Sequence, residues 1–174
     1  ASSIQLGTVR LQRVLSAMVI MVLVFTALEA NLAALRNAAP QAALGLLDAE
    51  NYLKANTGWY QPAMDTIRSL PQGSQTLLIY EPRAFYCRPA CKPDENLDRW
   101  RRDWTRYGNF SQIQQHWQAE GFSHLLVFRA GVEFMKENPD PKHPLESLLA
   151  LEEFLATLPL LEDFGSVYQL YLLK

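Results

Sequence analysis

Residues 14–35 (VLSAMVIMVLVFTALEANLAAL) form an almost uncharged stretch that restricts where this chain can work. Glu29 is its one charged side chain. A helix of this length spans about 33 Å, which matches a hydrocarbon core of about 30 Å. Because residues 18–25 are apolar on every side of such a helix, they suit contact with lipid better than burial along one stripe. We therefore expect a transmembrane helix over residues 14–36.

Two other interpretations of this stretch stay open. Its uninterrupted apolar part, residues 14–28, also has a length that suits the hydrophobic region of a secretory signal or a helix covered by a partner. Because the chain retains the segment, we expect an anchor rather than a cleaved signal. Pro40 is expected to end the helix, since proline disrupts a helix interior.

The flanking charges predict how the helix is oriented. Arg10 and Arg13 precede the apolar stretch, and Arg36 is the one close positive charge after it. The positive-inside rule then places residues 1–13 in the cytoplasm as a short stub. Residues 37–174 become a periplasmic or extracellular domain, and the protein is predicted to be a single-pass membrane protein.

Residues 37–174 have the length and patterning of one α/β domain. Apolar runs at 76–81 and 123–128 suit buried strands, and the closing runs around Gly165-Ser166 predict a β-hairpin with a type II′ turn. Strand, helix, strand, helix and hairpin in this order imply a small mixed sheet with flanking helices. The expected helices are 48–55 capped by Asp48, 61–70, 94–107, 112–120 capped by Ser111, and 145–157.

A basic and aromatic stretch runs from Arg83 to Arg106, where seven Lys or Arg residues face four Asp or Glu residues. An extracytoplasmic location argues against nucleic acid as its partner. The open interpretations are a solvated helix face with compensating acids, or a contact surface for an anionic lipid, a sugar or an acidic partner. Trp100 and Trp104 at i, i+4 fit either a core-facing stripe or sugar stacking. The candidate surface consists of Arg99, Trp100, Arg102, Trp104 and Arg106.

Cys87 and Cys91 are the sharpest local feature of the domain. Their C-x3-C spacing allows a disulfide if the loop turns tightly, which suits an oxidising compartment. No second cysteine pair or spaced histidine pair accompanies them, so a zinc site is disfavoured. We expect a structural disulfide, with free thiols and redox or metal chemistry as alternatives.

Glu81 and Arg83 follow the first predicted strand, at the edge where α/β sheets often bind ligands. They are interpreted as a structural ion pair or, alternatively, as a ligand-binding acid and electrophile. The sequence contains no nucleophile-elbow, phosphate-loop or dinucleotide-binding motif. We therefore predict no catalytic residues, no cofactor and no metal site.

The segment NTGWYQPAMDTIRSLPQGSQTLLIYEPRAFY (56–86) resembles a known family. Its Gln61-Pro62-Ala63-Met64 helix, its Leu70-Pro71-Gln72-Gly73 turn and its Glu81, Arg83 and Tyr86 element are similar to the C-terminal extracytoplasmic region of bacterial GT-C membrane glycosyltransferases. These polytopic enzymes are similar to dolichyl-phosphate-mannose–protein mannosyltransferases. The resemblance implies a final membrane helix followed by an extracytoplasmic tail. The family's catalytic carboxylate lies in an earlier loop, so the resemblance assigns no catalytic residue here.

Two functions from different classes are consistent with these features. The first is a non-catalytic, membrane-anchored accessory or interaction domain. It would lie in the bilayer and dock through residues 14–36 on a larger membrane-protein complex, such as an energy-transducing assembly. The alternative is the C-terminal extracytoplasmic fragment of a GT-C glycosyltransferase, which would aid the handling of an acceptor or a lipid-linked sugar. In both cases the chain alone is not expected to be an enzyme.

Overall fold

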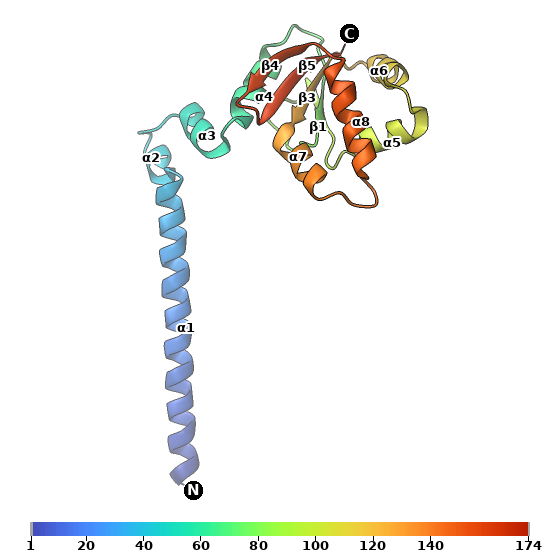
Figure 1. Ribbon diagram of the computed structural model, residues 1–174. Helices are drawn as coiled ribbons and strands as arrows, with labels where there is room; N and C mark the ends of the chain where they lie inside the picture. The colour runs from blue at the N-terminus through green and yellow to red at the C-terminus, as the bar shows by residue number, and fades with distance from the viewer. Residues whose placement is uncertain (1, 174) are drawn as a thin grey trace. The chain divides into compact units, whose positions relative to one another are not determined.

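The computed structural model describes residues 2–173, which form two compact units that meet in sequence between Asn56 and Thr57. The first unit begins with helix α1, Ser2–Arg36 (Figure 1). Two short helices follow, α2 at Ala39–Ala43 and α3 at Ala49–Thr57. The predicted cap of α3 is confirmed, because the Asp48 carboxylate accepts a hydrogen bond from the Asn51 backbone N–H at 3.0 Å.

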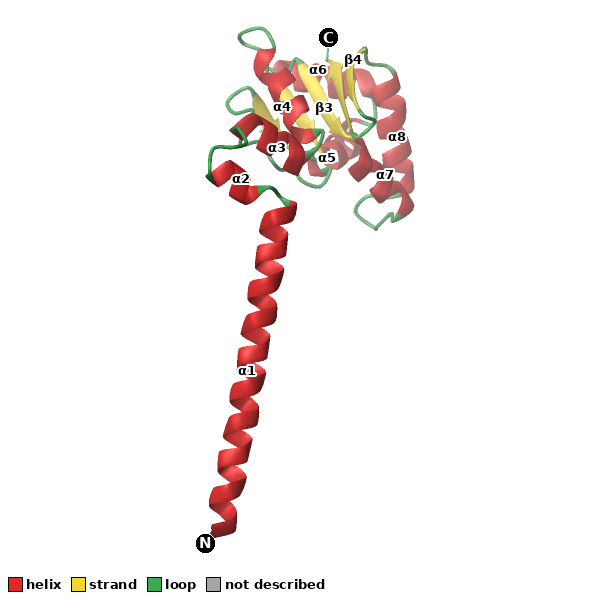
Figure 2. Ribbon diagram, turned by 90° about the vertical axis from the view of Figure 1, so that its left-hand side faces the viewer, coloured by secondary structure: helices red, strands yellow, loops and turns green. Residues whose placement is uncertain are grey.

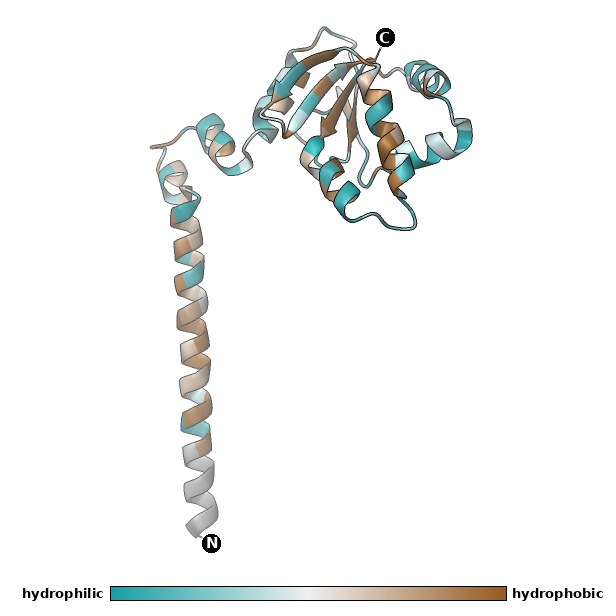
Figure 3. Ribbon diagram, viewed as in Figure 1, coloured by the Kyte–Doolittle hydropathy of each residue, from teal (hydrophilic) through white to brown (hydrophobic). Residues whose placement is uncertain are grey.

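Leu11–Arg36 within α1 is long and apolar enough to cross a membrane. An 18-residue window within it has a mean hydropathy of 2.1, and none of that window is buried by the rest of the chain. Figure 3 shows apolar residues along most of the visible length of this part of the helix. The helix ends at Arg36, where Ala38 adopts a left-handed φ of 54°, and Pro40 lies in the first turn of α2. Proline thus starts the next helix after a break that precedes it.

The second unit is built on a five-stranded mixed sheet with the order β2-β1-β3-β5-β4. Strand β1 is parallel to both β2 and β3, whereas β5 is antiparallel to both β3 and β4. The prediction of a mixed α/β fold with a closing hairpin is therefore confirmed. The strands are β1 (Thr76–Ile79), β2 (Cys91–Pro93), β3 (His124–Phe128), β4 (Leu160–Phe164) and β5 (Tyr168–Leu172).

Helices cover both faces of this sheet (Figure 2). Alternate residues of β1 point to opposite faces, so Leu77 and Ile79 pack in one core and Leu78 in the other. Helix α4 (Tyr60–Ser69) and the disulfide loop cover the Leu78 face. The helices on the Leu77 face are α5 (Asp98–Tyr107), α6 (Phe110–Ala119), α7 (Arg129–Glu137) and α8 (Leu145–Ala156).

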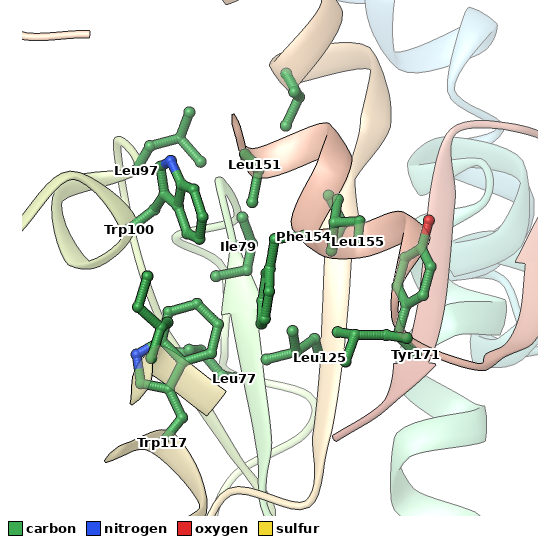
Figure 4. Close-up of a cluster of buried hydrophobic side chains, with 14 of the residues drawn as sticks. Leu77, Ile79, Leu97, Trp100, Trp117, Leu125, Leu151, Phe154, Leu155 and Tyr171 are labelled. Atoms are coloured by element: carbon green, nitrogen blue, oxygen red, sulfur yellow. The ribbon is translucent and has the colours of Figure 1, made fainter. Parts of the chain in front are cut away.

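The larger core combines aliphatic side chains with a group of aromatic rings (Figure 4). The ring of Phe154 in α8 lies 5.5 Å from Trp100 in α5 and 5.6 Å from Trp117 in α6. All three side chains are fully buried. The Trp100 indole N–H donates to the Ser147 carbonyl at 2.8 Å, so its polar atom is satisfied inside the core. This explains why α5 and α6 fold against α8.

Strand β2 and helix α7 were not predicted from the sequence. Strand β2 is only three residues long, and it forms because Thr76–Leu78 offers backbone partners, not because of its own pattern. Helix α7 follows β3 directly and contains Gly131 in its interior, which lowers its helix propensity.

Three local predictions are wrong in detail. Helix α5 begins at Asp98 rather than residue 94, because the Asp94 backbone is held by Leu78 and Glu81 at the sheet. Helix α6 is capped by the Asn109 side chain, which accepts from the Gln112 N–H. The hairpin turn has positive φ at both Gly165 and Ser166, which is the pattern of type I′ and not of type II′.

Candidate functional site

The candidate site lies where β1 ends, at the carboxyl edge of the parallel strands. Tyr80 leaves the strand with a left-handed φ of 59°, and this turn directs Glu81 inward. The Glu81 backbone N–H donates to the Asp94 carbonyl, and the two residues form an isolated antiparallel bridge beyond the parallel β1–β2 pairing. The Glu81 side chain is only 1% exposed, so its carboxylate needs partners inside the protein.

Arg83 and Tyr168 provide those partners. Glu81 Oε1 accepts from the Arg83 backbone N–H at 2.9 Å and from its Nε at 2.8 Å. Glu81 Oε2 accepts from Arg83 Nη2 at 2.7 Å and from the Tyr168 hydroxyl at 2.5 Å. Each carboxylate oxygen therefore has two donors, in the bidentate geometry that favours a charged pair. We call Glu81, Arg83, Tyr168 and Tyr60 the Glu81 cluster.

Tyr60 completes the cluster from the first turn of α4. Its hydroxyl donates to the Arg83 carbonyl at 2.7 Å, and the Arg83 guanidinium carbon lies 4.3 Å from the centre of its ring. The Tyr60 and Tyr168 ring centres are 6.3 Å apart. Helix α4, the loop after β1 and strand β5 are therefore held together at one point.

The electrostatics of the cluster favour neutral tyrosines beside one ion pair. Burial, with the nearby charge of Glu81, raises the pKa of Tyr60 to about 12. Burial and the hydrogen bond to Glu81 raise the pKa of Tyr168 still further. The hydrogen bond to Glu81 raises the pKa of Arg83, although desolvation opposes it. Both hydroxyls thus remain donors throughout the neutral range.

This geometry supports a structural role for Glu81 rather than proton transfer. A general base needs a free lone pair within reach of a substrate, and all four donors already occupy the Glu81 oxygens. The structure therefore brings the predicted Glu81–Arg83 pair together as an ion pair. Arg83 keeps 54% of its side chain exposed, so the outer part of the cluster faces solvent.

The edge beside the cluster is closely packed. The ring of Tyr80 stacks on Phe128 with centres 6.3 Å apart. Gly131 of α7 lies so near that a Cβ there would be 2.0 Å from Tyr80 Cδ1. A larger residue at Gly131 would displace the ring, which explains a glycine in the middle of a helix. Trp59 packs in a similar way against Gly165 at the hairpin turn.

The predicted disulfide is present between Cys87 and Cys91, whose Cα atoms are 5.6 Å apart. Both residues are buried: Cys87 lies in the loop that connects β1 to β2, and Cys91 is the first residue of β2. Their sulfur atoms each lie 3.6 Å from the Ala84 carbonyl oxygen. The disulfide thus fixes the loop at Pro82–Cys91, and we call this segment the stapled loop.

The residues of the candidate basic and aromatic surface have different environments in the structure. Trp100 is fully buried, so it does not belong to any contact surface, and its core-facing interpretation is correct. Arg99 pairs with Glu120 at 2.5 Å, and Arg102 pairs with the buried Asp103 at 3.1 Å. Arg106 lies over the Tyr107 ring at 5.2 Å. Most of the positive charge on α5 is therefore compensated within the helix layer.

Trp104 borders a surface cavity of this layer. It is stacked on Trp100 with centres 5.6 Å apart and contributes to the wall of a cavity of about 470 Å³. Lys142 and Ser147 line the same cavity. The Glu81 cluster and α5 belong to different parts of the fold, so the two candidate sites do not merge.

Metal-binding side chains do not gather in the described part of the chain. Among residues 2–173, no group of three or more His, Cys, Asp or Glu residues has a geometry that could hold a metal ion. His124 is bonded to the Ser123 hydroxyl at 2.8 Å, and burial lowers its pKa. His143 pairs with Asp140 at 3.2 Å.

Two residues of the Glu81 cluster were missed from the sequence. Tyr60 and Tyr168 are far from Glu81 along the chain, and Tyr168 is separated from it by 87 positions. The only signal was the alternation in the last apolar run, which places Tyr168 on a buried face of β5.

Comparison of the chain with models of known protein families gave no match. Comparisons with curated proteins and with solved structures also gave none. The functional argument therefore depends on the geometry of the chain itself.

Proposed function

We propose that this chain is a membrane-anchored, non-catalytic domain that docks on a larger membrane-protein assembly. The observation that carries the proposal is the helix Leu11–Arg36, which is 26 residues long, apolar and 0% buried. A surface of this kind is costly in water and needs lipid or a protein partner to cover it. The stability of the folded unit does not require it, because that unit has its own two cores.

The Glu81 cluster supports the non-catalytic half of the proposal. Its carboxylate is buried and has four donors, so it serves to hold three elements together. The flanks of the helix favour residues 37–174 on the extracytoplasmic side, since Arg10 and Arg13 precede the apolar stretch. The Cys87–Cys91 disulfide is consistent with that compartment.

Alkaline carbonate extraction tests the anchor directly. We expect the full chain to stay with the membrane pellet. A Leu23→Lys variant places a charge near the middle of the helix, at a cost of about 3 kcal/mol, and should be partly released. Leu44→Lys is the matched control, because Leu44 lies outside the span and is 75% exposed. Release of the unmodified chain would refute the anchor, and protease accessibility in intact spheroplasts would report its orientation.

Purification in a mild detergent tests the docking half. A stoichiometric membrane protein that co-purifies with the wild-type chain, and is lost when exposed span residues are shuffled, is the expected result. A chain that purifies alone at every detergent concentration would contradict docking.

A second candidate is the C-terminal fragment of a GT-C glycosyltransferase. Residues 56–86, the segment that resembles this family, form one connected layer, and this favours the second candidate. In that layer the Tyr60 hydroxyl of α4 donates to the Arg83 carbonyl in the loop after β1 at 2.7 Å. In that case the domain would aid the handling of an acceptor or a lipid-linked sugar. The genomic sequence upstream of residue 1 discriminates the two candidates. Several further hydrophobic helices would favour the glycosyltransferase, and a start codon close to residue 1 would exclude it.

A further inference from the structure

Phe85 is an unusual residue on the surface of the folded unit. Its side chain is 83% exposed, the highest value among the large apolar side chains that the structure describes. A single exposed apolar residue is normally unremarkable on a mobile loop. Phe85, however, lies in the stapled loop, Pro82–Cys91, and the backbone there is held at several points.

The contacts of the stapled loop hold Phe85 in place. Ala84 and Cys87, on either side of it, are buried. The Ala84 carbonyl accepts from the N–H groups of Cys87 at 3.3 Å and Arg88 at 3.2 Å, which closes a turn around Phe85. The Cys87–Cys91 disulfide and the hydrogen bond from Tyr60 to Arg83 fix both ends of that turn. The phenyl ring is thus presented by a loop whose conformational entropy is already lost.

A series of aromatic contacts connects Phe85 to the buried part of the folded unit. The centre of the Phe85 ring lies 5.2 Å from Tyr86 in an edge-to-face arrangement, and Tyr86 lies 6.3 Å from Tyr60. Tyr60 in turn contacts the buried Tyr168. Tyrosines below an exposed phenylalanine form an amphipathic gradient like that of residues at a membrane–water interface.

The charges of the stapled loop suit an anionic surface. Arg88 is exposed, whereas the charge of Arg83 is already balanced by its ion pair with Glu81. Glu81, the acidic residue that precedes the loop, is buried and neutralised by Arg83. The loop itself contains no other carboxylate. Phe134 offers a contrast: it is 58% exposed on α7, where Glu133 is paired with Lys136 and Glu137 adds a negative charge.

We propose that the stapled loop is a membrane-interface element, in which Phe85 inserts among the lipid headgroups of the bilayer that α1 spans while Arg88 contacts anionic lipid. This inference rests on the proposed membrane anchor. Residues 37–56 connect the span to the folded unit and reach at most about 70 Å even when fully extended. This tether raises the effective concentration of the loop at the bilayer, so a weak interfacial contact is enough to be populated.

Labelling of the full chain in vesicles tests the inference. Single Phe85→Cys and Phe134→Cys variants carry an environment-sensitive NBD probe, and the native cysteines do not react because they are bonded to each other. The vesicles contain phosphatidylcholine and phosphatidylglycerol, with a headgroup-proximal nitroxide lipid as quencher. We expect blue-shifted, strongly quenched emission at position 85 and water-like, weakly quenched emission at position 134. A labelled Arg88→Cys variant provides a second position, should Phe85→Cys fail to fold.

Charge provides an independent measurement. An Arg88→Gln change in the Phe85-labelled chain should lower the ratio of inserted to free loop about fivefold in the mixed vesicles, as expected for one basic residue near an anionic surface. It should have little effect in pure phosphatidylcholine. Equal, water-like emission at 85 and 134 in a chain that resists carbonate extraction would overturn the inference and leave the anchor intact. Extraction of the chain by carbonate would instead overturn the anchor, and the inference with it.

Discussion

Substitution of Tyr168 by Phe measures what the Tyr168 hydroxyl contributes to the free energy of unfolding. The Tyr168 hydroxyl donates to Glu81 Oε2 at 2.5 Å and accepts from Arg83 Nη2 at 2.7 Å, and the side chain is 2% exposed. A hydrogen bond to a charged group contributes about 1.5–3 kcal/mol. Glu81 keeps its bidentate arginine after the change, so no charge is left alone. We therefore expect a loss of about 2 kcal/mol in the free energy of unfolding.

Tyr171→Phe is the matched control on the same strand. Tyr171 lies on the opposite face of β5, is 7% exposed, and donates to the neutral Gln169 Oε1 at 2.6 Å. A neutral hydrogen bond contributes about 1 kcal/mol or less. The two substitutions remove the same atom from the same residue type, so their difference measures what the two charged partners of Tyr168 add over one neutral partner.

Urea denaturation of the full chain in detergent, followed by tryptophan fluorescence, gives both values. All four tryptophans lie between Trp59 and Trp117, so the signal reports on the folded unit and not on α1. Equal losses for the two variants, or a loss below about 0.5 kcal/mol for Tyr168→Phe, would refute the argument that charged partners strengthen this hydroxyl.

Three further experiments test other parts of the folded unit: an alkaline pH titration, removal of the disulfide, and substitution of Gly131. Because burial raises the pKa of Tyr60 from 10.0 to about 12, the unfolded chain loses this proton first. The free energy of unfolding should fall across that pH window, and Tyr60→Phe should flatten the fall in urea titrations. Replacing Cys87 and Cys91 together by Ala should lower the urea midpoint through a loss of about 2 kcal/mol, and an unchanged midpoint would contradict this. Gly131→Ala should cost about 1–3 kcal/mol and lower the melting temperature, because its Cβ would meet Tyr80 at 2.0 Å.

Much of the architecture was predictable because it depends on short-range pattern. The apolar runs of β1 and β3 and the paired runs of the hairpin identified four of the five strands and their succession along the chain, although β4 is mostly exposed. The stripe through Trp100 and Trp104 predicted a helix that packs on the core. Such elements carry their own hydrophobic signal and do not depend on distant residues.

The remaining elements depend on partners that are distant in sequence. Strand β2 has no pattern of its own and exists through its backbone pairing with β1. Glu81 and Arg83 were recognised as a pair, but Tyr168 became their third member only through the β3–β5 pairing. The positive charges of α5 were visible in the sequence. The ion pair between Arg99 and Glu120, however, depends on a contact between helices that composition does not show.

The Glu81 cluster is better explained as a device for placing the stapled loop than as a source of stability. Burying a charge is costly, and replacing a whole buried ion pair by apolar residues is often neutral for folding. A triple variant, Glu81→Met, Arg83→Met and Tyr168→Phe, should therefore unfold within about 1 kcal/mol of the wild type. Its loop amides, however, should lose protection in hydrogen exchange, because the fixed Arg83 guanidinium no longer ties the loop to β5. If those amides in the triple variant remain as protected as in the wild type, the disulfide and the Tyr60 hydrogen bond place Phe85 without the ion pair, and Glu81, Arg83 and the Tyr168 hydroxyl have no positioning role.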